Sequence, residues 1–160
     1  MAKDKDIKTN AMRILDSKKI NYTINTYECD EFIDGMQIAQ KLNQDPDISY
    51  KTLVTVGKSK EYYVFVIPIN KELDLKKAAR AVKEKAVEMI HVKDINKITG
   101  YIRGGCTPLG MKKLYPTVID ASAQELDKII ISGGRIGSQI FLSPQDLAQA
   151  VNGKFIEITL

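Results

Sequence analysis

Two β-rich runs separated by a short polar segment constrain the fold of this chain more than any other feature. Residues 50–56 and 62–67 are dominated by aromatic and β-branched side chains, which favour strands. The segment GKSKE between them is polar and starts with Gly57, which suits a turn. We therefore predict a β-hairpin over residues 50–67, which excludes an all-helical fold.

Helix start signals precede several apolar stretches. Thr9, Asp74 and Ser143 are predicted N-caps, and Asp34 with Gln37 forms a capping-box pattern. The predicted helices end near Lys18, near Asn43, after Val82 and at Gly153, and a further short helix over 94–99 closes at Gly100. Further strands are predicted over 20–27, where Ile20, Tyr22 and Ile24 alternate with polar residues, and over 87–91, 117–119, 129–131 and 155–158.

Helices and strands are mixed without regular βαβ alternation. No internal repeat or linker interrupts the 160 residues, a length typical of one compact domain. We predict an α+β fold with a mixed sheet, in a single domain over 1–160. The pattern leaves the topology open.

Composition and charge favour an ordinary globular protein of the cytoplasm. Hydrophobic residues make up 44% and charged residues 28%, and no apolar run is long enough to cross a membrane. The charged start MAKDKDIKTN lacks the apolar run of a secretory signal. The net charge of +4 suits a polyanionic partner. The basic cluster Lys76, Lys77, Arg80, Lys83 and Lys85 is either a phosphate-binding face or a solvated helix surface.

Residues for metal, cofactor or triad chemistry are scarce. Cys29 and Cys106 have no CxxC spacing and no histidine cluster, so we expect reduced thiols and no metal. His91 is the one histidine and has no readable Ser or Asp partner, so a packed or surface imidazole is expected. Phosphate-binding and dinucleotide-binding glycine motifs are absent, and we expect no cofactor. Two glycine segments stand out, GGCTPLG at 104–110 and SGGRIG at 132–137, and either could be a ligand-binding loop or a plain turn.

Several segments in the same order resemble the YbaK/ProX family of aminoacyl-tRNA trans-editing proteins. The longest are YKTLVTVG at 50–57, LDLKKAARAV at 73–82 and TGYIRGGCTPLGMKK at 99–113. INTYE at 24–28, PTVIDASAQE at 116–125 and ISGGRIG at 131–137 extend the resemblance over nearly the whole chain. It implies a mixed, barrel-like sheet core with flanking helices, similar to the editing domain of bacterial prolyl-tRNA synthetases.

The resemblance also implies an activity and a site. The activity is hydrolysis of the aminoacyl ester of mischarged Cys-tRNA(Pro), with the 3′ end of tRNA as partner and prolyl-tRNA synthetase as a further partner. Lys51 matches the family's catalytic lysine. The implied substrate-binding residues are Tyr27, Thr52, Gly104, Gly105, Thr107, Pro108, Ser132 and Gly133.

In the cysteine-specific branch of the family, the substrate's own thiol attacks its ester, so no protein nucleophile is needed. Lys51 alternates with Leu53 and Thr55, which predicts that its ammonium projects from one sheet face into a cleft as a positioning cation. Cys106 lies in the glycine loop, but no histidine or charged partner beside it would form a thiolate. We therefore expect a wall of the pocket there.

Two departures from the family pattern concern specificity. The branch often carries a phenylalanine before the second helix, for which this chain offers Phe32 or Met36. An aspartate after the second glycine loop is replaced, with Ser138 and Gln139 in that neighbourhood. Editing of Ala-tRNA(Pro) or of another small residue therefore stays open, as do a non-catalytic tRNA-binding or synthetase-associated module and an unrelated thiol hydrolase that uses Cys106.

Overall fold

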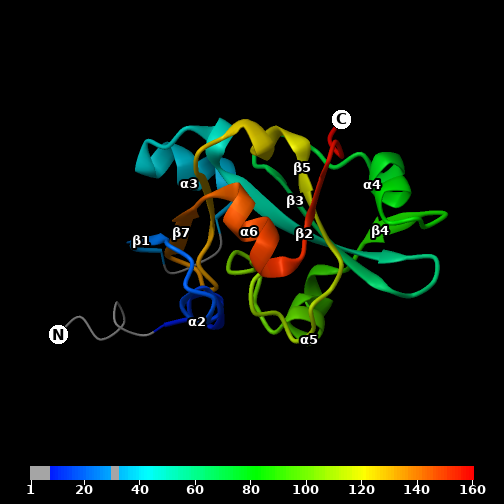
Figure 1. Ribbon diagram of the computed structural model, residues 1–160, viewed down its shortest axis with the longest axis horizontal. Coiled ribbons are helices and arrows are strands. Elements are labelled where there is room, and N and C mark those ends of the chain that lie inside the picture. Colours follow the sequence, from blue (N-terminus) through cyan, green and yellow to red (C-terminus); the bar gives the residue numbers. More distant parts are fainter. Residues whose placement is uncertain (1–7, 30–32) are drawn as a thin grey trace.

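The predicted hairpin is present and runs along much of the molecule (Figure 1). The computed structural model describes residues 8–29 and 33–160. Strands β2 (Tyr50–Gly57) and β3 (Tyr62–Pro68) pair antiparallel along their length. The interior of β3 is almost fully buried, which agrees with its apolar sequence.

The hairpin belongs to a five-stranded mixed sheet in the order β4-β2-β3-β5-β8. Strand β4 pairs antiparallel with β2, whereas β5 pairs parallel with β3 and β8 pairs parallel with β5. The added strands are β4 (Val87–Met89), β5 (Thr117–Asp120) and β8 (Lys154–Ile156). The α+β class and the mixed sheet are thereby confirmed.

A separate three-stranded antiparallel sheet has the order β1-β7-β6. Its strands are β1 (Thr23–Thr26), β6 (Ile129–Ser132) and β7 (Ser138–Leu142), and the last of these was not predicted. A parallel bridge between Ser49 and Ile130 connects this sheet to the segment entering β2. The two sheets therefore meet at the start of the hairpin.

Strands β1, β4 and β8 differ from their predicted ranges, and β4, predicted over 87–91, ends at Met89. Strand β1 has four residues, and Ile24, expected on a half-buried face, is 43% exposed. Because β1 pairs only with β7 at an edge, its alternation does not place Ile24 in the core. Strand β8 starts at Lys154 and ends two residues earlier than predicted, although Ile158 beyond it is buried.

The predicted caps are confirmed at the starts of four helices. Thr9, Asp34, Asp74 and Ser143 each accept a hydrogen bond from a backbone N–H of the first turn. The α-helices are α2 (Asn10–Ser17), α3 (Gly35–Leu42), α4 (Leu75–Ala81), α5 (Ile95–Thr99) and α6 (Pro144–Val151). The 3₁₀ helices are η1 (Pro46–Ile48), η2 (Val92–Asp94) and η3 (Ala121–Glu125).

The end of α6 corrects one prediction. The residue in the left-handed conformation is Asn152, with φ of 57°, and not Gly153. Asparagine adopts this conformation more readily than most side chains because its amide can hydrogen-bond the local backbone. The last residue of the helix is therefore Val151, and Asn152 caps it before the glycine.

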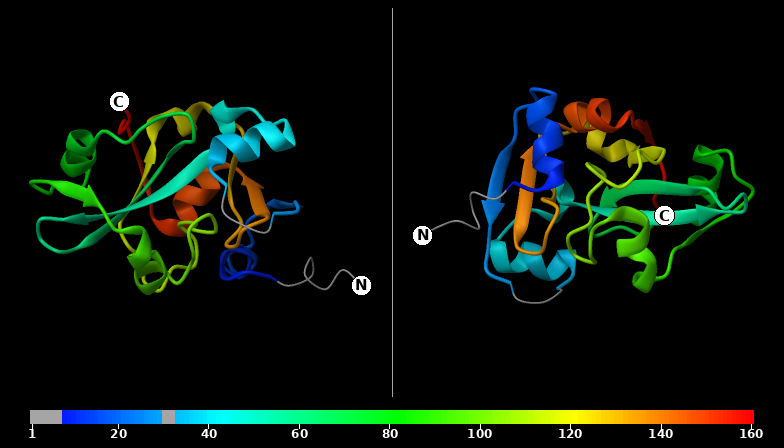
Figure 2. Two further views of the ribbon diagram at one scale, coloured as in Figure 1. Left: turned by 180° about the vertical axis from the view of Figure 1, so that it is seen from behind. Right: turned by 90° about the horizontal axis from the view of Figure 1, so that it is seen from below.

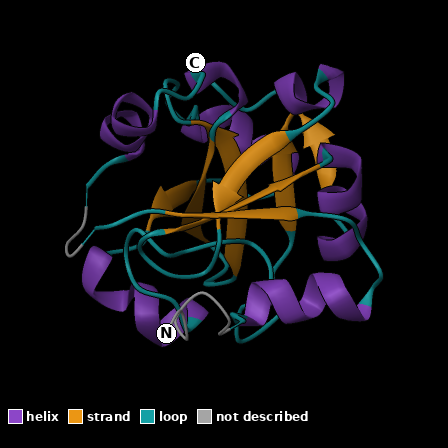
Figure 3. Ribbon diagram, turned by 90° about the vertical axis from the view of Figure 1, so that its left-hand side faces the viewer, coloured by secondary structure: helices purple, strands orange, loops and turns teal. Residues whose placement is uncertain are grey.

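The helices surround the strands, as Figures 2 and 3 show. Ala11, Leu15 and Leu147 of α2 and α6 join the largest core cluster together with residues of β6 and β7. Ala78 and Ala79 of α4 join a second cluster with Phe65 and Ile67 of β3. No helix within the described residues is long and apolar enough to cross a membrane.

Candidate functional site

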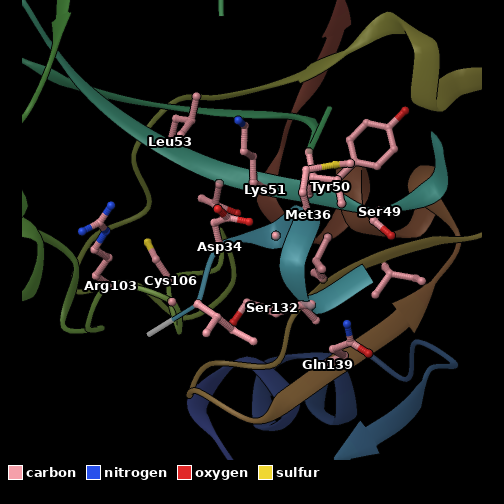
Figure 4. A pocket seen from close by; sticks show the side chains of 18 of the residues that line it. Asp34, Met36, Ser49, Tyr50, Lys51, Leu53, Arg103, Cys106, Ser132 and Gln139 are labelled. Carbon is pink, nitrogen blue, oxygen red and sulfur yellow. The ribbon is translucent and has the colours of Figure 1, made fainter. Parts of the chain in front are cut away.

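A cavity of about 540 Å³ lies where the two sheets meet. Its walls come from β2 of the larger sheet, from β6 and β7 of the smaller sheet, and from the start of α3 (Figure 4). The segment from β4 to α5 and the loop around residues 103–106 complete it. Segments far apart in the sequence thus share one site.

Lys51 stands on the wall that β2 contributes. It lies opposite Ile67 of β3, two residues beyond the bridge between Ser49 and Ile130. Lys51 lines the cavity, and Figure 4 shows its side chain extending from β2. Within the described part of the chain, no hydrogen bond or ion pair engages its ammonium, since the ion pairs found there are Lys8–Asp16 and Lys77–Glu157. The charge is therefore available to a ligand.

One end of the cavity is polar and closed. Gln44 and Gln139 exchange two hydrogen bonds at 2.8 and 3.0 Å, and Asn25 donates a third to Gln139 at 3.1 Å. Ser138 is 2% exposed, and its Oγ has no hydrogen-bond partner among the described residues. The hydroxyl lies against Gly133 of the second glycine segment, since a Cβ added at that glycine would meet Ser138 Oγ.

The two glycine segments pack against each other. A Cβ added at Gly105 would lie 2.8 Å from the backbone Cα of Arg135, so only glycine permits this approach. Gly104 itself has φ of 88°, a left-handed conformation that disfavours other residues. The hydroxyl of Tyr101 donates a hydrogen bond to Leu109 O at 2.5 Å, which stabilises the first loop. The loops are therefore a joint structural unit at the edge of the cavity.

The cavity also contains a cysteine and a tyrosine in altered environments. Burial raises the pKa of the Cys106 thiol to about 11. The thiol is therefore neutral at neutral pH, which agrees with its predicted place in the wall. Burial also raises the pKa of Tyr27, and Lys41 Nζ lies 5.9 Å from the centre of its ring.

The structure brings five of the sequence-predicted site residues to the cavity, namely Lys51, Tyr27, Thr52, Gly104 and Ser132. It does not place Gly105, Thr107, Pro108 and Gly133 on the cavity wall. Gly105 and Gly133 sit at close backbone approaches behind the wall, and Thr107 and Pro108 are buried. These four residues shape the loops instead of lining the cavity.

Other positions raised by the sequence divide between the cavity and its surroundings. Met36 and Gln139 line the cavity, whereas His91 is an exposed N-cap residue outside it. Phe32 lies outside the described residues. Among those residues, no group of three or more His, Cys, Asp and Glu side chains could hold a metal ion.

Sequence reasoning missed the open, apolar end of the cavity. Met89, Val92 and Ile95 line this end of the cavity. The charged residues Arg103 and Asp34 also line the cavity. The short apolar run VEMIH predicted a strand. The same pattern does not tell whether Met89 packs in the core or faces a cavity. The sequence did indicate the position of Asp34, because its capping box places it at the start of α3. In Figure 4 this end of α3 faces Lys51.

Comparisons with known proteins show the family to which this chain belongs. Residues 35–150 match the model of the aminoacyl-tRNA editing domain. A protein of Enterococcus faecalis (strain ATCC 700802 / V583), EbsC, named as a Cys-tRNA(Pro)/Cys-tRNA(Cys) deacylase, is 46% identical over 99% of this chain and 98% of its own length.

Two solved structures share the fold. One is that of a hypothetical protein, with a TM-score of 0.87, 18% identity and coverage of 95% of this chain and 100% of the other. The other is described as a trans-editing enzyme for prolyl-tRNA synthetase, with a TM-score of 0.79, 19% identity and coverage of 96% and 99%. With the family match over 35–150 and the relative at 46% identity, the chain belongs to the aminoacyl-tRNA editing domain family.

Proposed function

We propose that this protein is a trans-editing hydrolase that cleaves the aminoacyl ester of Cys-tRNA(Pro). The observation that carries the proposal is the unengaged ammonium of Lys51 over a cavity with a closed polar end. The name of the relative at 46% identity supports the cysteine ester as substrate. Charged tRNA is used in the cytoplasm, and we place the activity there.

Lys51 serves as a positioning cation in this proposal. A cation beside the 3′-terminal ribose and phosphate would fix the ester and stabilise negative charge that develops on the carbonyl oxygen. The aminoacyl group would occupy the polar end, where the amides of Gln44 and Gln139 offer hydrogen-bonding groups and Tyr27, Thr52 and Ser132 contribute walls. The Gly104–Pro108 loop, which follows Arg103, would hold the adjoining wall of the cavity in a fixed shape.

The nucleophile in the proposed reaction is the thiol of the substrate. Its sulfur forms a bond to the ester carbonyl carbon, the bond from that carbon to the ribose oxygen breaks, and the thiol proton passes to the ribose oxygen. Water then opens the resulting cyclic thioester and releases cysteine. No protein nucleophile is needed, which suits a cavity without a histidine among its described walls.

Two other functions remain as alternatives. Hydrolysis of Ala-tRNA(Pro) stays open because the aspartate that the resemblance implies after the second glycine loop is replaced, with Ser138 and Gln139 in that neighbourhood. A non-catalytic module is disfavoured because Lys51 and Gly104 both reach the cavity. Prolyl-tRNA synthetase remains a proposed partner that could supply tRNA identity.

A deacylation panel tests the proposed function. The purified protein is incubated with proline tRNA charged with cysteine, alanine or serine, and release of the amino acid is measured. We expect release of cysteine at least ~100-fold faster than release of serine or alanine, since only cysteine carries the attacking thiol. Faster release of alanine would instead support the alternative substrate, and release of none would support the non-catalytic module.

The Cys106→Ala variant tests the source of the nucleophile. We expect deacylation of Cys-tRNA(Pro) within about twofold of the parent rate, because a thiol whose pKa is raised to about 11 is protonated at neutral pH. In both the parent and the variant, the rate above the uncatalysed background should rise with pH and level off once the substrate thiol is deprotonated, below the pKa of about 11 of the Cys106 thiol. Loss of activity in this variant, or a parent rate that still rises above pH 10 while that of the variant does not, would identify Cys106 as the nucleophile.

A further inference from the structure

The open end of the cavity is an apolar surface that the hydrophobic core leaves exposed. We define the apolar rim as Leu53, Met89, Ile90, Val92 and Ile95, all of which line the cavity. Met89 is 43% and Val92 is 55% exposed, although large apolar side chains are normally withdrawn from water. Exposed apolar side chains gathered at a cavity mouth are typical of binding sites.

The apolar rim rests on a fixed base. Ile90 and Ile98 belong to one core cluster, and Tyr115 donates its hydroxyl to Ile98 O at 2.8 Å. Ile90 N also bonds to Val54 O at 3.2 Å, which joins the rim to β2. The rim therefore has a defined shape before any ligand binds.

Lys51 separates this rim from the polar end. Leu53 follows Lys51 by two residues on β2 and lies on the same face of the strand. Figure 4 shows Leu53 and Arg103 on one side of Lys51, and Ser49 and Gln139 on the other. Two cations, Lys51 and Arg103, and one carboxylate, Asp34, line the cavity. The carboxylate accepts a hydrogen bond from Gln37 N as the cap of α3.

This order of surfaces matches the order of groups at the end of a charged tRNA. The aminoacyl group is joined to the terminal ribose, which carries adenine on its other side and a phosphate towards the next nucleotide. A small aminoacyl group suits the closed polar end, and the ribose and phosphate suit the cations. The flat, largely apolar faces of a purine suit aliphatic side chains that would otherwise face water.

We infer that the apolar rim is the binding surface for the terminal adenine of the tRNA, with Met89 and Val92 as its principal contacts. This inference rests on the proposed function and deepens it, because it fixes the direction in which the substrate enters the cavity. Binding of the adenine fixes the position of the ribose, and the ester then lies beside Lys51.

The test measures the kinetics of two variants on each of two substrates. Acceptor minihelices are charged with cysteine and end either in adenosine or in a ribose without a base. For the adenosine substrate, Met89→Ser and Val92→Ser should each raise KM roughly fivefold to tenfold, with kcat within about twofold of the parent value. For the base-free substrate, both variants should match the parent, which itself shows the raised KM. Leu114→Ser is the matched control, since Leu114 is 66% exposed and does not line the cavity.

Equal losses on both substrates, or no loss on either, would overturn the inference. Binding measurements distinguish a failure of this inference from a failure of the proposed function. The dissociation constants of a non-hydrolysable cysteinyl amide of 3′-amino-3′-deoxyadenosine and of its base-free counterpart can be measured without turnover. A parent that prefers the adenosine form, and a Met89→Ser variant that does not, would support the adenine surface even if no ester were cleaved. Equal affinity of the parent for both forms would exclude it.

Discussion

Replacing Lys51 with alanine should lower kcat/KM for deacylation of Cys-tRNA(Pro) by roughly 100-fold or more, because the substrate loses its positioning cation. The fold should survive, since no hydrogen bond or ion pair engages the ammonium among the described residues. We expect the free energy of unfolding to change by less than about 1 kcal/mol. Initial rates together with thermal unfolding curves measure both effects.

Lys154→Ala is the matched control for this variant. Lys154 also lies on a strand of the five-stranded sheet, but it is exposed and outside the cavity. Its replacement should leave deacylation unchanged. If a folded Lys51→Ala protein turned over as fast as the Lys154→Ala protein, the proposed role of Lys51 would be wrong.

Replacing Gly105 with alanine should damage both stability and activity, because the new methyl group would meet the backbone of Arg135 at 2.8 Å. A backbone neighbour cannot rotate away as a side chain can, so the two glycine loops must separate. We expect a loss of roughly 2–3 kcal/mol in the free energy of unfolding and a fall of at least tenfold in kcat/KM as the rim of the cavity shifts. Chemical denaturation and initial rates check the two parts.

Two further glycine variants distinguish a loss of activity caused by backbone strain at the cavity from one caused by a less stable fold. Gly104→Ala forces alanine into a left-handed conformation on the cavity wall, so activity should fall more than stability. Gly153→Ala lies away from the cavity and brings the new carbon no closer than 3.3 Å to a side chain of Val151. It should cost less stability than Gly105→Ala and leave kcat/KM unchanged, because its nearest neighbour is a side chain and the position lies outside the cavity. Unchanged kinetics in both Gly104→Ala and Gly105→Ala would reduce the loop to an ordinary turn.

Local signals explain why much of the fold could be predicted from the sequence. The caps at Thr9, Asp34, Asp74 and Ser143 act within one helical turn, so their residue types suffice to locate the helix starts. The β2–β3 hairpin is equally local. Strand β7 was missed because its first residues, Ser138 and Gln139, face the cavity and interrupt the apolar pattern.

The site was less predictable because its parts come from distant segments. Lys51 and Gly104 could be singled out only by resemblance, since a strand lysine and a loop glycine are common. Nothing local indicates that Gly105 meets Arg135, thirty residues later, or that Gln44 pairs with Gln139. The apolar rim was missed because exposed and buried apolar side chains are identical in sequence.

The bridge between Ser49 and Ile130, where the two sheets meet, has a consequence for how such a site diversifies. At the polar end, wall residues such as Ile131 and Ser138 are also interior residues of the smaller sheet, so exchanging them to admit another amino acid disturbs packing as well. At the apolar rim, Met89 and Val92 project into solvent and can vary at little structural cost. The polar end is therefore constrained by packing as well as by the ligand, whereas the apolar rim is constrained by its proposed contact with the adenine alone.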